Sequence, residues 1–286
     1  MPVKSLVSVL LVSLFFQGCS SLFFYPDKMT YKKPSDYGLE YKDIYFKSAD
    51  KTSLHAWHIY TKSAKPKGLI FLAHGNAQNL SSHFTSWVWL IEEGYELFIF
   101  DYRAYGKSEG KSELKGSIED TRAALDHLET IYKEPYVACG QSLGGTLLLN
   151  ALQERNNTQI QAVVIDSTFT GFSDIASQKM DGVWLTWPFQ WIPYLSLDAD
   201  YDAKDKVTKI NKPFLFLHGS LDKVVSVNES WQLFELSKPP KELWVIKDAE
   251  HTQGLSKLNV RKDFLDFLNK GKNYYDVHYS HMRIYE

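Results

Sequence analysis

The sequence is poor in cysteine and has no excess of basic charge. Only Cys19 and Cys139 are present in 286 residues, too few for a disulfide scaffold or for a zinc site built from paired cysteines. With 32 lysines and arginines against 34 aspartates and glutamates, the chain lacks the positive field that nucleic-acid binding requires. It also lacks metal-ligand spacings and glycine-rich phosphate loops, so we predict neither a metal nor any other cofactor.

Apolar segments of two alternating types predict an α/β fold. Strand-like runs lie near 41–47, 53–61, 68–73, 96–101, 135–140, 161–166, 213–218 and 242–247. Helical periodicity is found near 83–93, 117–133, 143–155, 225–237 and 257–270, with Ser117, Glu119 and Asp120 as an acidic helix start. The alternation predicts one domain with a mostly parallel sheet flanked by helices, in which the first two strands form an antiparallel hairpin.

One glycine-rich segment has the pattern of a nucleophile elbow. Residues 136–151 read Y-V-A-C-G-Q-S-L-G-G-T-L-L-L-N-A, an apolar strand that runs into Gly-x-Ser-x-Gly and then into an apolar helix. Gly140 and Gly144 permit a turn in which larger side chains beside Ser142 would collide, and Gly145 lets the helix pack closely. The alternative interpretation, a structural glycine-rich turn with a solvated serine, stays open on this pattern alone.

A serine nucleophile needs a histidine base and a carboxylate that orients the base. In hydrolases with this elbow, the order along the chain is serine, acid, histidine. Asp222 ends the segment P-F-L-F-L-H-G-S-L-D, and His251 ends E-L-W-V-I-K-D-A-E-H, so both lie beyond the carboxyl end of a predicted parallel strand. Asp166 also ends a strand and is the competing acid. His74 and His218 each precede a glycine in a tight turn, which favours a structural role.

The oxyanion formed during acyl transfer needs two hydrogen-bond donors. The backbone N–H of Leu143, directly after the nucleophile, is the expected first donor. The segment G-L-I-F-L-A-H-G-N-A at 68–77 is expected to supply the second. There Gly75 lets the backbone turn toward Ser142, which makes the Asn76 N–H the natural donor. The alternative for this segment is an ordinary strand-ending turn.

Six short motifs, spread from about residue 22 to about residue 270, resemble those of the α/β-hydrolase superfamily. They are L-F-F-Y-P-D at 22–27, H-G-N-A at 74–77, D-Y-R-A-Y-G-K-S-E-G at 101–110, G-Q-S-L-G-G at 140–145, H-G-S-L-D at 218–222 and E-H at 250–251. Within the superfamily the chain is similar to the Bem46-like (alpha/beta hydrolase domain 13-like) serine hydrolases. The resemblance implies hydrolysis without naming a substrate. Ala104 stands where the family usually has glycine, which concerns the shape of that loop and leaves the triad unaffected.

The stretch between the strands that end at Asp166 and begin at Pro213 is longer than an ordinary loop. We expect a small helical cap over Ser142 at about 167–211. Its aromatic side chains are Phe169, Phe172, Trp184, Trp187, Phe189, Trp191 and Tyr194. Three roles are open for them: lining an apolar acyl pocket, packing the cap onto the sheet, or, for the tryptophans, contact with a bilayer surface.

The start of the chain has the pattern of an export signal. Lys4 precedes an almost wholly apolar run at 6–16, and a small residue follows before a cleavage site, which predicts a signal peptide over residues 1–18. The alternative is an uncleaved signal anchor over about 3–24, which has the length to span a bilayer. Both interpretations place the enzyme outside the cytosol and attached to a membrane.

A lipid attachment site is the more specific interpretation of this start. The Gly-Cys pair resembles a bacterial lipobox, in which the lipidated Cys19 becomes the mature N-terminus. Ser20 then resembles an outer-membrane sorting signal for a Gram-negative source. Phe16 and Gln17 depart from the residues usual at those positions. We therefore divide the chain into a signal peptide at 1–18, a tether at 19–29, a hydrolase domain at 30–271 and a tail without assigned role at 272–286.

These patterns together predict a membrane-attached serine hydrolase that cleaves a carboxylic ester or thioester with an apolar acyl group. Ser142 is expected to attack the acyl carbonyl, with His251 as base, Asp222 as orienting acid and the Asn76 and Leu143 N–H groups as oxyanion donors. A serine peptidase or amidase of the same fold and a non-catalytic surface binding protein are the alternatives. The sequence does not fix the acyl length, the leaving group, the choice between hydrolysis and acyl transfer, or the oligomeric state.

Overall fold

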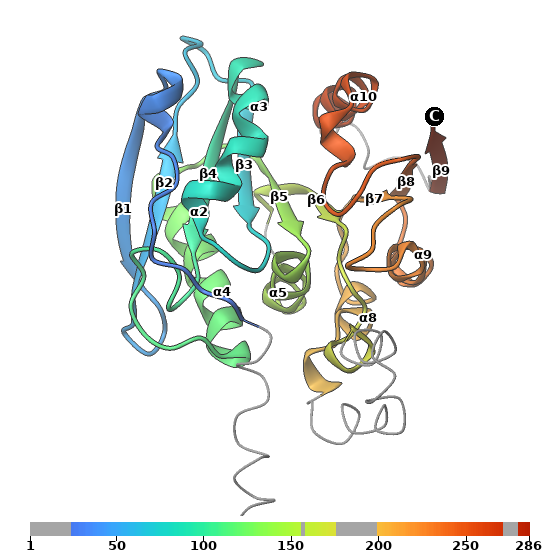
Figure 1. Ribbon diagram of the computed structural model, residues 1–286, viewed down its shortest axis with the longest axis horizontal. Coiled ribbons are helices and arrows are strands. Elements are labelled where there is room, and N and C mark those ends of the chain that lie inside the picture. Colours follow the sequence, from blue (N-terminus) through green and yellow to red (C-terminus); the bar gives the residue numbers. More distant parts are fainter. Residues whose placement is uncertain (1–23, 156–157, 176–198, 271–279) are drawn as a thin grey trace, which may run out of the picture.

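The computed structural model describes residues 24–155, 158–175, 199–270 and 280–286 (Figure 1). A nine-stranded, mostly parallel sheet carries helices on both faces, which confirms the predicted α/β-hydrolase fold. The strands are β1 (Tyr41–Lys47), β2 (Ser53–Ile59), β3 (Gly68–Ala73), β4 (Tyr95–Asp101), β5 (Tyr136–Gln141), β6 (Ile160–Asp166), β7 (Phe214–Gly219), β8 (Lys241–Ile246) and β9 (Ser280–Tyr285). The α-helices are α2 (Leu80–His83), α3 (Val88–Glu92), α4 (Leu114–Ile131), α5 (Leu143–Leu152), α8 (Ala203–Val207), α9 (Val227–Leu236) and α10 (Leu258–Lys270).

The strand order β1-β2-β4-β3-β5-β6-β7-β8-β9 brings the predicted site segments together. β1 and β2 form the expected antiparallel hairpin, β2 pairs antiparallel with β4, and all later pairs are parallel. Every residue of β5, β6 and β7 is buried, because helices cover both faces of these central strands. Since β3, β5, β6 and β7 are neighbours and parallel, the loops that follow them meet at one edge of the sheet.

Two apolar clusters hold the helices to the sheet, one on each face. The first contains buried residues of α4, α5, α8 and α9, and the second contains buried residues of α2, α3 and α10. α5 is buried along its whole length, which explains why its sequence is apolar without an evident polar face. This burial fixes the helix that begins directly after Ser142.

The start of α4 corrects one prediction. The helix begins at Leu114, one turn before the expected start at Ser117, and Ser117 and Asp120 are buried inside it. The reason is a long-range contact: Arg103 donates from Nε and Nη2 to the two carboxylate oxygens of Asp120, at 2.9 and 2.8 Å. Gly116 makes room for the guanidinium, since a Cβ there would lie 2.2 Å from Arg103 Cζ. Asp120 is therefore an ion-pair partner rather than a helix-start residue.

The segment near 83–93, expected as one helix, contains α2, a 3-10 turn at Phe84–Trp87 and α3 in succession. The end of the tail, which had no assigned role, is β9, a ninth strand parallel to β8. Tyr285 is buried there, and its hydroxyl donates to Asp263 Oδ2 of α10 at 2.9 Å.

Several residues named in the sequence predictions lie outside the described residues. They are the signal peptide, Cys19, and the cap aromatics Trp184, Trp187, Phe189, Trp191 and Tyr194.

Candidate active site

Ser142 lies at the junction of β5 and α5 in a backbone conformation that is costly for a residue with a side chain. Its φ is 52° and its ψ is −120°. The surrounding glycines leave no room for side chains: a Cβ at Gly144 would lie 2.1 Å from Ala73 O, and one at Gly145 would lie 1.9 Å from Thr168 Oγ1. The tight strand-to-helix turn predicted from the sequence is therefore present, with Ser142 at its tip.

Two hydrogen bonds attach this turn to the end of β6 and the residues directly after it. Ser142 N donates to Asp166 O at 2.8 Å, and Thr168 Oγ1 donates to Ser142 O at 3.0 Å. Leu143 is the first residue of α5, so its N–H is among those that a helix leaves without an intrahelical acceptor. Its position directly after Ser142 suits an oxyanion donor, and that role stays a prediction.

Asp222 and His251 form a hydrogen-bonded pair, as their order in the chain predicted. His251 Nδ1 donates to Asp222 Oδ2 at 2.7 Å. The Asp222 side chain is fully buried, whereas 22% of the His251 side chain is exposed. Because Nδ1 is committed to the carboxylate, Nε2 is the ring nitrogen that can accept a proton. The pair thus presents Nε2 as the proton acceptor that a serine nucleophile needs, and its catalytic role stays a prediction.

Further donors hold Asp222 ionised. The backbone N–H groups of Val224 and Val225 donate to its Oδ1 at 2.8 and 2.9 Å, and His218 Nε2 lies 3.3 Å from Oδ2. Burial opposes ionisation, but these donors and His251 outweigh it and lower the pKa of Asp222 below its ordinary value. His218 is itself buried and bonded to Ser230 Oγ at 2.7 Å and to the Val225 carbonyl at 3.0 Å, and its contact with Asp222 was not predicted from the sequence.

The loops that carry the acid and the histidine are joined by main-chain contacts. Leu221 N donates to Ala249 O at 2.9 Å, and Gly219 allows this approach because a Cβ there would lie 2.3 Å from the same oxygen. Thr252 N, directly after His251, donates to Ser167 Oγ at 3.2 Å. Since Ser142 N bonds to the residue before Ser167, the end of β6 connects the histidine loop with the elbow.

The competing acid Asp166 does not contact His251 through a hydrogen bond in the part of the chain that the structure describes. Gln141 Nε2 donates to its Oδ2 at 3.0 Å, and Ser167 Oγ donates to its Oδ1 at 3.1 Å. Burial raises the pKa of Asp166, which disfavours the ionised form that an orienting acid requires. The Asp166 carboxylate therefore stabilises the end of β6 through these two bonds. The hydrogen bond to His251 favours Asp222 as the orienting acid.

The loop after β3 lies directly against the nucleophile. A Cβ placed on Gly75 would lie 3.7 Å from Ser142 Cβ, so the two backbones are in van der Waals range. The Asn76 side chain fixes this loop, because its Oδ1 accepts from Tyr25 N at 3.0 Å and from the Tyr105 hydroxyl at 2.7 Å. The proposed oxyanion donor, the Asn76 N–H, thus lies on a loop that is held by two hydrogen bonds to the Asn76 side chain.

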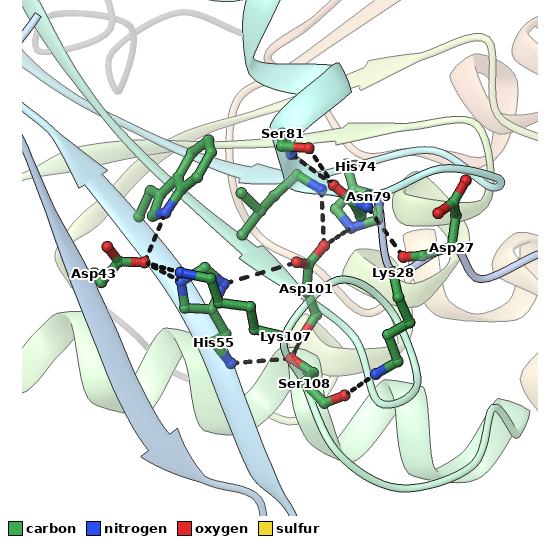
Figure 2. Close-up of polar contacts among 12 residues, drawn as sticks. Asp27, Lys28, Asp43, His55, His74, Asn79, Ser81, Asp101, Lys107 and Ser108 are labelled. Carbon is green, nitrogen blue, oxygen red and sulfur yellow. Dashed lines mark hydrogen bonds and ion pairs between the residues drawn. The ribbon is translucent and has the colours of Figure 1, made fainter. Parts of the chain in front are cut away.

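Beneath this loop lies a buried cluster of charged and polar groups (Figure 2). His74 Nδ1 donates to Gly75 O at 2.7 Å, and its Nε2 lies 3.3 Å from Asp101 Oδ1. The same carboxylate accepts from Leu80 N at 2.8 Å and faces His55 Nδ1 at 3.8 Å. Burial works against ionisation of Asp101, but these partners lower its pKa. Sequence reasoning missed this cluster, and its one signal was the position of Asp101 in the D-Y-R-A-Y-G motif.

The expected cap is described only in part. Phe169 and Phe172, at the start of the expected cap, are buried with ring centroids 5.1 Å apart, so they pack onto the domain. Cys139 on β5 is buried, and burial raises the pKa of its thiol. In the described ranges no group of His, Cys, Asp or Glu could hold a metal ion, and no helix there is long and apolar enough to span a bilayer.

Comparison with known proteins places the chain among hydrolases. Residues 64–202 match the hydrolase family described as serine aminopeptidase, S33. The uncharacterized protein YfhR of Escherichia coli strain K12 is 32% identical over 263 residues, covering 88% of each chain. Protein bem46 of Schizosaccharomyces pombe is 27% identical over 216 residues, covering 73% of this chain and 70% of its own. The structure of the Pyrococcus furiosus esterase Pf2001 superposes with a TM-score of 0.69 at 25% identity, covering 87% of this chain and 97% of the esterase.

Proposed function

We propose a function from the premise that this chain belongs to the Bem46-like branch of the α/β-hydrolase superfamily and is therefore a hydrolase. The proposed reaction is the cleavage of carboxylic esters or thioesters through an acyl-enzyme. The observation that carries the proposal is the strained Ser142 at the end of β5, beside loops that hold an Asp222–His251 pair with a 2.7 Å hydrogen bond. The superposed Pyrococcus furiosus protein is an esterase, which supports the choice of an ester.

In the proposed reaction, Ser142 Oγ forms a bond to the acyl carbon while His251 Nε2 takes the serine proton. The carbonyl oxygen becomes an oxyanion that accepts from the N–H groups of Leu143 and Asn76. When the tetrahedral intermediate collapses, the bond to the leaving group breaks and His251 returns the proton to that group. A water molecule then attacks the acyl-enzyme with the same proton transfers, releasing the acid and restoring Ser142. Asp222 stays ionised and holds the His251 tautomer throughout.

The test is the replacement of the nucleophile. Ser142→Ala should lower kcat on a soluble nitrophenyl ester by about 10⁴-fold or more and abolish labelling by a fluorophosphonate probe, with an unchanged thermal unfolding temperature. The exposed Ser256, in the loop after His251, provides the matched control, and Ser256→Ala should keep both properties. Wild-type labelling at a residue other than Ser142, or full activity in Ser142→Ala, would reject the proposal.

A peptidase is the second candidate, because the matching family is described as a serine aminopeptidase. Amide and ester cleavage use the same acyl-enzyme chemistry, so the described site serves both. Turnover of aminoacyl-nitroanilides at a kcat/KM above that of nitrophenyl esters would favour the peptidase. A wild-type chain that no fluorophosphonate labels would favour the non-catalytic binding protein instead.

We further propose that the chain is attached to a membrane through Cys19. The proposal rests on the apolar run at 6–16 and the lipobox-like pair that follows it. Metabolic labelling with a fatty-acid analogue should mark the wild type and not Cys19→Ala. Membrane association of Cys19→Ala without such labelling in either chain would favour the uncleaved anchor.

A further inference from the structure

The described part of the proposed tether, residues 24–29, packs on the loop that carries Asn76. Phe24 is buried in the core, and Tyr25 N donates to Asn76 Oδ1 at 3.0 Å. Asn79 Nδ2 donates to Asp27 O at 3.0 Å and to Met29 O at 2.7 Å, and Figure 2 shows Asn79 directed toward Asp27. The first described residues are therefore attached to the loop that carries Asn76, the proposed second oxyanion donor.

Apolar side chains on both sides of the nucleophile are exposed at this edge. On the N-terminal segment 60% of Tyr25 and 58% of Met29 are exposed, and beside Asp222 50% of Leu221 and 47% of Val224 are exposed. Tyr25 and Met29 lie on the segment that is bonded to the loop after β3, Leu221 and Val224 lie in the loop after β7, and β5 lies between β3 and β7 in the strand order. Three strand spacings separate β3 from β7, which is about 14 Å. These four are exposed large apolar side chains on the two segments that flank Ser142, and exposed apolar patches are a feature of membrane-contact surfaces.

The length of chain before this segment limits how far the site can lie from the proposed lipid anchor. Tyr25 follows Cys19 by six positions, and even a fully extended chain of that length spans only about 20 Å. Because Tyr25 bonds to Asn76, the proposed oxyanion loop is held within the same reach of the membrane surface. A domain attached this closely has the apolar edge at the active site available as its second membrane contact.

We propose that this edge docks on the membrane surface and that the substrate is an acyl ester of an amphiphile embedded in that surface. The inference rests on the proposed hydrolase function and on the proposed tether. Tyrosine and aliphatic side chains at the edge would enter the interfacial region, where a tyrosine ring is favoured. The bound ester would then reach Ser142 without leaving the membrane for water.

The experiment compares one leaving group in two settings. The full-length chain is reconstituted in vesicles of phosphatidylethanolamine and phosphatidylglycerol that carry a long-chain 4-methylumbelliferyl ester, and 4-methylumbelliferyl acetate is assayed in solution. Met29→Ser with Leu221→Ser should lower the vesicle rate by about tenfold or more and leave the acetate kcat/KM within about twofold. Met282→Ser with Ile284→Ser on β9 removes apolar groups that are 37% and 63% exposed, and should leave both rates unchanged.

Each outcome decides the matter. Equal losses on both substrates, an unchanged vesicle rate in the edge variant, or an equal loss in the β9 variant would overturn the docking proposal while the hydrolase proposal stands. A wild type that hydrolyses neither ester and takes no fluorophosphonate label would overturn the hydrolase proposal, and the docking proposal with it. The thermal unfolding temperature reports that each variant is folded, so an equal loss on both substrates is read only in folded protein.

Discussion

The replacement Asp222→Asn tests the orientation of the histidine most directly, because the structure determines how the new amide must lie. Oδ1 of Asp222 accepts from the Val224 and Val225 N–H groups at 2.8 and 2.9 Å. Only the amide oxygen can accept these two bonds, so the amide nitrogen must take the place of Oδ2. That nitrogen then donates toward His251 Nδ1, which has to become the acceptor. The proton of the neutral imidazole moves to Nε2, where it blocks proton transfer from Ser142.

The expected loss follows from this tautomer reversal. A histidine held in the wrong tautomer lowers kcat by about 10⁴-fold, which corresponds to about 5 kcal/mol of transition-state stabilisation. Unfolding free energy should fall by only about 1–3 kcal/mol, because one buried charge-assisted bond is exchanged for a neutral one. The assay is kcat on a soluble nitrophenyl ester together with urea denaturation of the same sample. KM should change little, since Asp222 contacts the histidine and not the substrate.

Asp248 supplies the matched control for this change. It is an exposed carboxylate three residues before His251, with a φ of 59° that asparagine tolerates well. Asp248→Asn should keep kcat within about twofold of the wild type. If Asp222→Asn retained more than a tenth of the wild-type kcat with an intact fold, the orientation argument would be refuted. A loss of equal size in Asp248→Asn would show that the charge of the loop matters and the tautomer does not.

Two further predictions concern the packing around the site. Gly144→Ala should cost about 3 kcal/mol of unfolding free energy in urea, because its Cβ would lie 2.1 Å from Ala73 O. Gly75→Ala, whose nearest contact would be 3.4 Å, should cost less than about 1 kcal/mol, and equal costs would contradict the reasoning. Asp101→Asn should remove stability that depends on pH. The pKa of Asp101 is lowered in the folded state, so its contribution is complete above the unfolded value of about 3.9 and is lost as pH falls below it. The difference in unfolding free energy between wild type and variant should therefore be constant above about pH 5 and shrink below about pH 4; a difference that does not shrink would show that the carboxylate charge contributes nothing.

The central strands and the Asp222–His251 pair could be predicted because their signals are local. β5, β6 and β7 are buried on both faces and therefore read as unbroken apolar runs. Asp222 and His251 each follow such a run by a short turn, and parallel strands bring their carboxyl ends to one edge of a sheet. The sequence could not supply the strand order that makes β3 and β5 neighbours.

The features that escaped prediction depend on contacts between distant residues. β9 contains His281 and Arg283 among its apolar residues and lies at the sheet edge, so it has no apolar run. The start of α4 was misplaced because the partner of Asp120 is Arg103, which no local pattern reveals. The N-terminal segment was expected as a tether, and its packing on the loop of Asn76 depends on a bond between the Tyr25 N–H and the Asn76 side chain, which lie 51 residues apart in the chain.

The attachment of the N-terminal segment has a consequence for how this protein can diverge in evolution. Asn76 and Asn79 hold the segment by the Tyr25 N–H and by the carbonyl oxygens of Asp27 and Met29, which any residue at those positions provides, except that proline would remove the Tyr25 donor. Substitutions of the exposed side chains of Tyr25 and Met29 should therefore have little effect on the position of the loop that carries Asn76, whereas Phe24 is constrained by its burial. Selection should act on Phe24 and on the two asparagines, so related chains would keep these side chains more strictly than the exposed ones between them.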